Sequence, residues 1–220
     1  MITPVLLLQT GPVSCWSIGC DLDGETFDAN RSADIDRLRH RLGVPGAMRQ
    51  CLQEHGTLID ENGETPACDA FLLHPGEAAL VRHADCFPVV VADPTRSRAV
   101  LAHCGWRGSI AGLAGKCARR LIRDGSRPQD LFAAIGAGIG AASFEVGPEV
   151  LGAFPEQFRA ETSWGTPSVD LIGLLRNDLE CAGLPEVRVH APDTYTDPAW
   201  HSYRRDGSHS GRNATLCIVV

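Results

Sequence analysis

Two long apolar runs near the middle of the chain, separated by a short polar segment, constrain the fold more than any other feature. Residues 78–91 are mostly apolar, and residues 98–103 form a second run. The segment between them, Asp93-Pro94-Thr95-Arg96-Ser97, is typical of a turn. Apolar runs bounded by turn residues predict a β-hairpin, or two neighbouring buried strands.

A helical pattern follows these runs. Apolar side chains recur at spacings of three, four and four residues, at Ile110, Leu113, Cys117 and Leu121, while basic residues take the opposite face. Similar patterns predict helices over 34–42 and 169–182, a loop over 60–70, and strands over 131–135, 187–190 and 214–220. Because strands and helices alternate along the chain, the sequence predicts the α/β class.

Composition narrows the class of protein further. Of the 220 residues, 44% are hydrophobic and 21% are charged, which is ordinary for a globular domain and excludes intrinsic disorder. The sequence contains no repeat or biased linker, so we expect one domain over residues 1–220. A formal net charge of −7 argues against non-specific nucleic-acid binding, which needs clustered Lys and Arg.

Membrane and export signals are missing from the sequence. No run approaches the roughly 18 apolar residues of a membrane-spanning helix. The apolar run at 4–8 is too short for a signal peptide, and no basic residue precedes it. The nine cysteines are odd in number and lack zinc-finger spacing, so most are expected to be buried thiols. We therefore expect a cytoplasmic protein without a membrane partner.

Histidine and cysteine stand at the ends of several predicted elements. His55, Cys86 and His103 are separated by 31 and 17 residues, which is not a local zinc motif. Two His and one Cys nevertheless form a zinc ligand set that leaves a fourth position for water or substrate. The alternative is that each His is an ordinary hydrogen-bonded residue at a strand end.

Two further segments could bind an anion. The glycine-rich stretch around Gly138 and Gly140 could let backbone N–H groups converge on a phosphate, or could simply form a tight exit from a strand. Near the C-terminus, Arg204, Arg205 and Arg212 could hold a phosphate or carboxylate through paired N–H donors. The alternative for this second segment is a solvated loop.

Arg107 is the remaining candidate for anion binding. It lies between Gly105 and Gly108, just before a helix expected to begin near Ser109. Helix N-termini carry unpaired N–H groups and attract anions, so we predict that Arg107 binds phosphate beside His103. The alternative is a salt bridge from Arg107 to an acidic neighbour.

Taken together, several segments resemble the laccase-domain family, first labelled multicopper polyphenol oxidoreductases and later purine nucleoside phosphorylases. The likeness covers roughly residues 30–220, and residues 1–30 match poorly. The matching segments are Gln53-x-His55-Gly56, Ala84-Asp85-Cys86-x-Pro88-Val89, His103-x-Gly105-Trp106-Arg107-Gly108, Ile139-Gly140 with Glu145-Val146-Gly147, and Ser202-Tyr203-Arg204-Arg205-Asp206-Gly207 with Gly211-Arg212. This resemblance implies a layered α/β domain with mixed β-sheets flanked by helices.

The resemblance also implies a function. It maps the family's metal ligands onto His55, Cys86 and His103, and implies zinc-dependent phosphorolysis of adenosine, inosine or methylthioadenosine, with adenosine deamination as a companion activity. The partners would then be a purine nucleoside and phosphate. Cys86 would bind as a thiolate, and His55 and His103 as neutral imidazoles. Asp85 would orient a ligand or accept a substrate proton.

This sequence departs from the family pattern at several positions. Where the family continues Ile-Gly-Pro-Cys-Cys-Tyr-Glu-Val-Gly, this chain carries Ala141, Ala142, Ser143 and Phe144. Asp193 replaces a family cysteine, and the N-terminal Gly-Gly-x-Ser pattern is missing. The metal ligands are thus intact, whereas the substrate pocket is changed.

Other functions compete with this interpretation. A cysteine hydrolase acting on an amide of a cell-wall precursor would use Cys86 as nucleophile and His103 as base, without metal. A copper phenol oxidase, which the older family label suggests, is disfavoured because two His and one Cys cannot supply a multicopper cluster. With the pocket altered, a binding module without catalysis is a further alternative.

Overall fold

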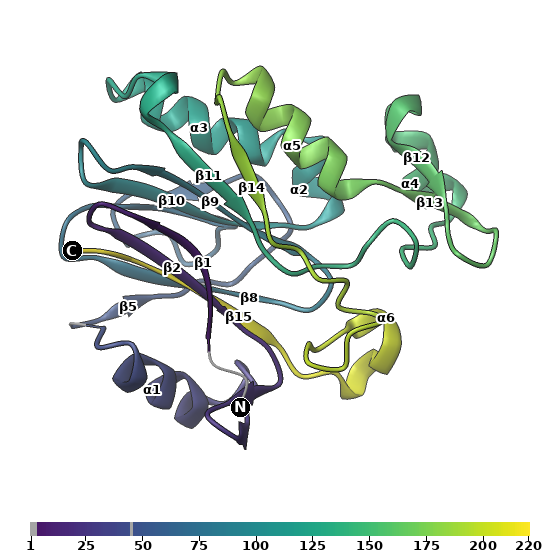
Figure 1. Ribbon diagram of the computed structural model, residues 1–220, viewed down its shortest axis with the longest axis horizontal. Coiled ribbons are helices and arrows are strands. Elements are labelled where there is room, and N and C mark those ends of the chain that lie inside the picture. The colour runs from purple at the N-terminus through teal and green to yellow at the C-terminus, as the bar shows by residue number, and fades with distance from the viewer. Residues whose placement is uncertain (1–3, 45) are drawn as a thin grey trace.

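The computed structural model describes residues 4–44 and 46–220, and two β-sheets form its centre (Figure 1). The five-stranded sheet has the order β1-β2-β15-β8-β5, and the six-stranded sheet has the order β14-β11-β9-β10-β7-β6. The first contains β1 (Val5–Thr10), β2 (Val13–Ile18), β5 (Met48–Arg49), β8 (Ala78–His83) and β15 (Asn213–Val219). The second contains β6 (Ile59–Asp60), β7 (Ala70–Leu73), β9 (Phe87–Asp93), β10 (Arg98–Cys104), β11 (Phe132–Ile135) and β14 (Val187–Val189).

Outside the two large sheets, the described residues form α-helices, two short β-ribbons and three short 3-10 helices (Pro128–Asp130, Glu156–Phe158 and Gly207–His209). The helices are α1 (Ser32–Arg41), α2 (Trp106–Ile110), α3 (Leu113–Arg123), α4 (Pro148–Ala153), α5 (Leu171–Cys181) and α6 (Tyr203–Asp206). The ribbons pair β3 (Asp21–Leu22) with β4 (Glu25–Thr26), and β12 (Arg159–Glu161) with β13 (Pro167–Val169).

These elements stack in four layers with a hydrophobic core between each pair. Helices α3 and α5 cover one face of the six-stranded sheet, and the five-stranded sheet packs against its other face (Figure 1). Helix α1 covers the outer face of the five-stranded sheet. Both sheets are mixed, because the β5–β8, β6–β7 and β11–β14 pairs are parallel and the other pairs are antiparallel.

This layering explains why the central runs are continuously apolar. On β9, Phe87, Val89 and Val91 pack beneath the helices. Val90 and Ala92 point the other way, into the core between the two sheets. A strand covered on both faces needs apolar side chains at consecutive positions, each worth roughly 1.5–3 kcal/mol for a fully buried Val or Phe.

The structure confirms the predicted α/β class with mixed sheets and flanking helices, and the hairpin about residues 93–97. β9 and β10 pair antiparallel with Asp93 opposite Arg98. The predicted helix at 34–42 is α1, and the strands predicted at 131–135, 187–190 and 214–220 are β11, β14 and β15. The helix predicted over 169–182 is α5, whose first residue is Leu171 because Val169 ends β13.

Other predictions are corrected. The apolar run at 78–91 is two strands, β8 and β9, which separate at residues 84–86 and enter different sheets. The helix expected near Ser109 begins instead at Trp106, and Gly112 in the left-handed conformation (φ +77°) divides it into α2 and α3. Part of the predicted 60–70 loop is extended, since Asp60 ends β6 and Ala70 begins β7.

Within the described residues, we find no helix with the length and apolar character needed to cross a membrane.

Candidate metal centre and active site

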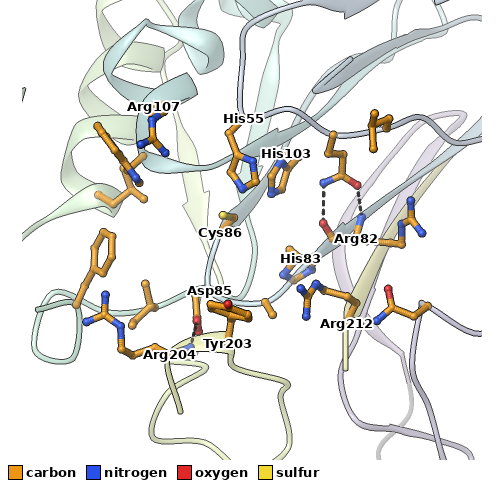
Figure 2. A pocket seen from close by; sticks show the side chains of 18 residues that line it. His55, Arg82, His83, Asp85, Cys86, His103, Arg107, Tyr203, Arg204 and Arg212 are labelled. Carbon is orange, nitrogen blue, oxygen red and sulfur yellow. Dashed lines mark hydrogen bonds between the residues drawn. The ribbon is translucent and has the colours of Figure 1, made fainter. Parts of the chain in front are cut away.

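The three predicted metal-binding side chains lie together although they come from three parts of the fold. His55 lies in the loop between β5 and β6, Cys86 in the connection between β8 and β9, and His103 on β10. Pairing of β9 with β10 places His103 opposite Pro88, two residues from Cys86. One donor atom from each residue lies within 4.8 Å of the other two, and Figure 2 shows these side chains grouped together.

The two imidazoles differ in their surroundings. His103 is buried, whereas His55 is exposed on the cavity side. Their ring centroids are 4.9 Å apart in an edge-to-face arrangement. Nδ1 of His103 donates to Oδ1 of Asp69 at 2.9 Å. Because Asp69 holds the proton on Nδ1, Nε2 is the ring nitrogen of His103 that can give up its proton and bind a metal.

Electrostatics favour a charged pair at this site before any metal binds. Burial raises the pKa of the Cys86 thiol, but the charge of His103 and hydrogen bonds from His103 and His55 outweigh it and lower this pKa to about 6. Burial lowers the pKa of His103, but the Cys86 thiolate and Asp69 raise it to about 9. Near pH 7, Cys86 is therefore a thiolate, the form in which cysteine binds metals.

The donor set fits a zinc ion with one open position. Zinc prefers Cys sulfur and His nitrogen at about 2.3 and 2.0–2.1 Å, which places donors about 3.5 Å apart in a tetrahedron. The donor atoms here lie within 4.8 Å of one another, and the exposed His55 side chain is the one that can move to shorten its distances to the other two. Three protein ligands with a fourth position free are typical of catalytic rather than structural zinc. Among residues 4–44 and 46–220, this is the one His/Cys/Asp/Glu cluster with metal-binding spacing.

Two glycines allow the start of α2 to pack against this site. A Cβ atom on Gly105 would lie 2.6 Å from Cδ2 of His55 and 3.3 Å from Sγ of Cys86. A Cβ atom on Gly108 would lie 2.6 Å from the carbonyl oxygen of Gly56. Both glycines of the Gly-Trp-Arg-Gly segment are thus required by close packing against the loop that carries His55.

We expect Gly105→Ala to lower zinc affinity about tenfold or more, because the new methyl group displaces the His55 ring. Disturbing the groups that orient metal ligands typically costs 10–100-fold in affinity. Gly147→Ala is a matched control, since Gly147 precedes α4 with nearly the same backbone (φ −76°, against −75° at Gly105) and has open space around it. Competition with a chromophoric chelator measures both, and equal affinity in the two variants would contradict this packing role.

The triad lines a cavity of about 730 Å³. Of the other residues predicted from the sequence, Asp85, Arg107, Arg204 and Arg212 also line it. Figure 2 shows Arg107 on one side of the triad, Arg82 and Arg212 on the opposite side, and Asp85 below with Arg204 and Tyr203. The structure thus brings most of the predicted site residues to one place.

Three predicted phosphate-binding residues lie outside the cavity wall. The Arg205 guanidinium donates to the carbonyl oxygens of Thr194, Tyr195 and Trp200. These hydrogen bonds stabilise the loop at residues 194–200. Gly138 packs on Phe87, whose ring a Cβ atom would meet at 2.4 Å. At Gly140, a Cβ atom would lie 3.1 Å from the Asp193 carboxylate. All three positions have packing or loop-holding contacts in the structure, and their role in anion binding stays a prediction.

Arg107 lies in the cavity wall, but its setting differs from the prediction. It is inside the first turn of α2 rather than ahead of a helix, and α2 is only five residues long. Its guanidinium stacks over the Trp106 ring at 4.2 Å. The alternative salt bridge exists only as a contact of 4.0 Å with Glu149, whose side chain is 82% exposed. Exposed pairs of this kind are weak, so Arg107 is available to a ligand.

Asp85 is held firmly at the cavity wall. Its carboxylate accepts hydrogen bonds from Oγ1 of Thr194 and the backbone N–H of Arg204, both at 2.7 Å. Its backbone has φ +84°, a conformation that non-glycine residues seldom adopt and that recurs at functional sites. This carboxylate is therefore a fixed hydrogen-bond acceptor beside Cys86.

Two of the departures from the family pattern, Ser143 and Asp193, are in contact with each other. Oγ of Ser143 donates to Oδ2 of Asp193 at 2.6 Å, joining two loops that lie 50 residues apart in sequence. Asp193 also accepts from the backbone N–H of Tyr195. This Ser–Asp bond holds the segment that carries Phe144, which lines the cavity.

Further residues line the cavity beside the predicted site residues. Arg82 and His83 end β8, within the run predicted as apolar, and of these two only Arg82 lies outside the segments that the sequence marks as able to carry chemistry. His83 is buried, and burial together with the charges of His103 and His201 lowers its pKa to about 3, so it is neutral. Gln53 was part of a matched motif, and its amide pairs with the backbone of Arg82 at 2.7 and 2.9 Å.

Comparisons with known proteins identify the family of this chain. A family model described as multi-copper polyphenol oxidoreductase laccase matches residues 20–220. The chain belongs to this family. It is 35% identical over 222 residues to a purine nucleoside phosphorylase of Pseudomonas aeruginosa, covering 95% of this chain and 88% of that protein. It is 31% identical over 205 residues to a purine nucleoside phosphorylase of Mycobacterium tuberculosis, covering 88% of this chain and 80% of that protein.

The match to another relative spans only about half of that relative's length. The match to the purine nucleoside phosphorylase of Deinococcus radiodurans, at 34% identity, spans 63% of this chain and 55% of that protein. Among solved structures, protein NMB0706 of Neisseria meningitidis has a TM-score of 0.81 at 24% identity and covers 98% of both chains. Protein YfiH of Bacillus licheniformis has a TM-score of 0.81 at 21% identity, covering 94% of this chain and 93% of that one. These structures support the fold.

Proposed function

We propose that this protein is a zinc-dependent purine nucleoside phosphorylase that acts on adenosine, inosine or methylthioadenosine. The observation that carries the proposal is the convergence of His55, Cys86 and His103 in a cavity whose wall is rich in arginine. The names of relatives at 31–35% identity support the same reaction class. The volume of about 730 Å³ suits a nucleoside together with phosphate.

The cavity gathers positive charge in an acidic protein. Four arginines line it, namely Arg82, Arg107, Arg204 and Arg212, although the chain has a net charge of −7. Within the described part of the chain, none of these guanidiniums has a carboxylate oxygen closer than the 4.0 Å contact of Arg107 with Glu149. Arg204 and Arg212 donate through Nη1 to backbone carbonyls, whereas within the described residues the guanidiniums of Arg82 and Arg107 have no such hydrogen bond. Arg82 and Arg107 are therefore best suited to bind phosphate through paired N–H donors.

Aromatic side chains offer flat surfaces for a purine. Trp106, Phe144 and Tyr203 line the cavity, and each ring has an arginine over it, at 4.2, 5.5 and 5.7 Å respectively. Aromatic rings favour offset or edge contacts with other π systems, and these contacts add to the burial of apolar area. The same wall thus provides both base-binding and anion-binding groups.

In the proposed reaction, the C1′–N9 bond of the nucleoside breaks and a phosphate oxygen bonds to C1′, while the base leaves with a proton. When bound, zinc supplies a Lewis acid that can polarise an oxygen or lower the pKa of water to about 7. The Arg107 guanidinium donates hydrogen bonds to the phosphate oxygens. The Asp85 carboxylate accepts a substrate proton or hydrogen bond. Deamination of adenosine is the proposed companion activity, in which water adds to C6 of the base and the amino group leaves as ammonia.

One observation favours a second candidate, a cysteine hydrolase. Cys86 and His103 form a thiolate–imidazolium pair in the metal-free protein, with pKa values of about 6 and 9. Such a pair is the activated nucleophile of many cysteine hydrolases. For a copper phenol oxidase, in contrast, the single cluster found in the described residues offers too few ligands for several copper ions.

A nucleoside panel with and without phosphate tests the proposal. We expect phosphate-dependent release of the free base together with ribose 1-phosphate, loss of this activity on chelation, and recovery when zinc is returned. A cysteine hydrolase would survive chelation and release no sugar phosphate. Base release that is independent of both phosphate and metal would contradict the proposed function.

A further inference from the structure

Asp69 is a buried carboxylate that contacts two of the three candidate metal ligands. It immediately precedes β7, and only 1% of its surface is exposed. Four donors converge on its two oxygens: Nδ1 of His103 at 2.9 Å, and the backbone N–H groups of His55, Gly56 and Glu54 at 3.0, 2.7 and 3.2 Å. These four donors belong to His103 or to the loop that carries His55.

On one side, Asp69 fixes the orientation of the His103 ring. Because an ionised carboxylate only accepts hydrogen bonds, the shared proton lies on Nδ1 of His103. Nε2 is then the ring nitrogen that can lose its proton and bind a metal beside Cys86 and His55. The backbone carbonyl of Asp69 also accepts from the N–H of His103 at 2.7 Å, which anchors the same residue a second time.

On the other side, Asp69 shapes the loop that carries His55. Three successive backbone N–H groups, from residues 54 to 56, point at one carboxylate, an arrangement that favours a negative charge. His55 itself has φ +60°, in the left-handed region. A non-glycine residue held there costs of order 1 kcal/mol or more, and it persists only where its surroundings hold it.

We propose that Asp69 is a positioning residue that holds two metal ligands at once, His103 through its ring and His55 through its backbone. Metal affinity therefore depends on the negative charge of Asp69, although Asp69 is not itself a ligand. The inference rests on the zinc-binding part of the proposed function and is independent of the identity of the substrate.

An amide cannot replace this carboxylate. Asparagine offers one acceptor oxygen and a donor NH₂ group, whereas all four neighbouring groups are donors. In Asp69→Asn, the NH₂ group would face N–H groups, so the ligand loop or the His103 ring must move. Oxygen-to-nitrogen exchange at Asp69 changes almost no volume, and this makes it a selective test of charge and hydrogen bonding.

Asp60→Asn is a matched control. Asp60 is also buried, at 2% exposure, and its carboxylate accepts from Arg49, Gly63 and Thr65. It holds a neighbouring loop in the same way but has no contact with the three candidate ligands. Loss of its charge should lower thermal stability in the same manner as at Asp69 while leaving the metal site intact.

The experiment measures zinc affinity by chelator competition in wild type, Asp69→Asn and Asp60→Asn. We expect a 10–100-fold weaker zinc affinity in Asp69→Asn, the range typical for groups that orient metal ligands. For Asp60→Asn we expect less than a threefold change. Equal zinc affinity in Asp69→Asn and wild type would overturn the inference, and so would an equal loss in both variants.

A measurement on the zinc-loaded wild type covers the case in which Asp69→Asn does not fold. Long-range ¹⁵N–¹H spectra of the histidine rings should show a proton on Nδ1 of His103 and none on Nε2. A proton on Nε2 would overturn the role of Asp69. If the wild-type protein binds no zinc, the proposed zinc-dependent function is wrong. If the wild type binds zinc and Asp69→Asn binds it equally tightly, only the role of Asp69 is wrong.

Discussion

Replacing His55 with alanine is expected to remove most of the bound zinc and to slow nucleoside cleavage by about 1000-fold. Metal Lewis-acid chemistry contributes several kcal/mol, and each 1.36 kcal/mol corresponds to a factor of ten in rate. His55 is the exposed member of the triad, so its truncation opens no cavity in the core. Metal analysis and initial rates with excess phosphate measure the two effects.

His40→Ala provides the control for His55→Ala. His40 is also an exposed histidine, but it lies on α1, outside the wall of the 730 Å³ cavity. It should retain one zinc per chain and full activity. Full zinc occupancy in His55→Ala would show that the ligand assignment is wrong, whereas loss of zinc with unchanged cleavage would show that the reaction does not use the metal.

The central part of the fold was predictable because its signals are local. The turn at residues 93–97 and the apolar runs on either side of it specify the β9–β10 hairpin without reference to distant residues. The N-terminal hairpin of β1 and β2 was not predicted, although Gly11-Pro12 marks a turn between its two short strands. It is stabilised by pairing with β15 at the other end of the chain, where Ser17 contacts Thr215 across 198 positions. Periodicity within a window cannot detect a partner so far away.

The candidate site was only partly predictable for the same reason. Residue types and the family resemblance identified His55, Cys86 and His103, and the structure places them together. Asp69 carries no motif, since it is a single acidic residue in a stretch that looks like a polar loop. Its bond to His103 spans 34 positions and becomes visible only when β7 pairs with β10.

The substituted family positions show how contacts can change together. Ser143 and Asp193 replace residues that are cysteines in the family pattern, and the two side chains are hydrogen-bonded at 2.6 Å. In the sequence, these are two separate departures from the family pattern, and each indicates a changed substrate pocket. In the structure they form one polar contact that supports the Phe144 segment, so the altered pocket retains a defined wall.

Arg107→Lys is expected to weaken the apparent affinity for phosphate by about 5–150-fold while leaving zinc content unchanged. Lysine keeps the positive charge but loses the two parallel N–H donors of the guanidinium, and charge-assisted hydrogen bonds are worth about 1–3 kcal/mol. Arg107 has only a 4.0 Å contact with an exposed glutamate to break. Its guanidinium is therefore already free to turn toward an anion in the cavity.

Arg123→Lys is the control for Arg107→Lys, because Arg123 is an exposed arginine on α3 outside the cavity wall. The measurement is the phosphate dependence of base release at saturating nucleoside, with zinc content determined on the same samples. A rise in the phosphate KM in Arg107→Lys alone, with equal zinc content in the two variants, would place Arg107 on the phosphate. If phosphate dependence is the same in both variants, Arg107 does not bind phosphate, and the anion-binding role passes to the arginines on the opposite side of the triad, Arg82 and Arg212.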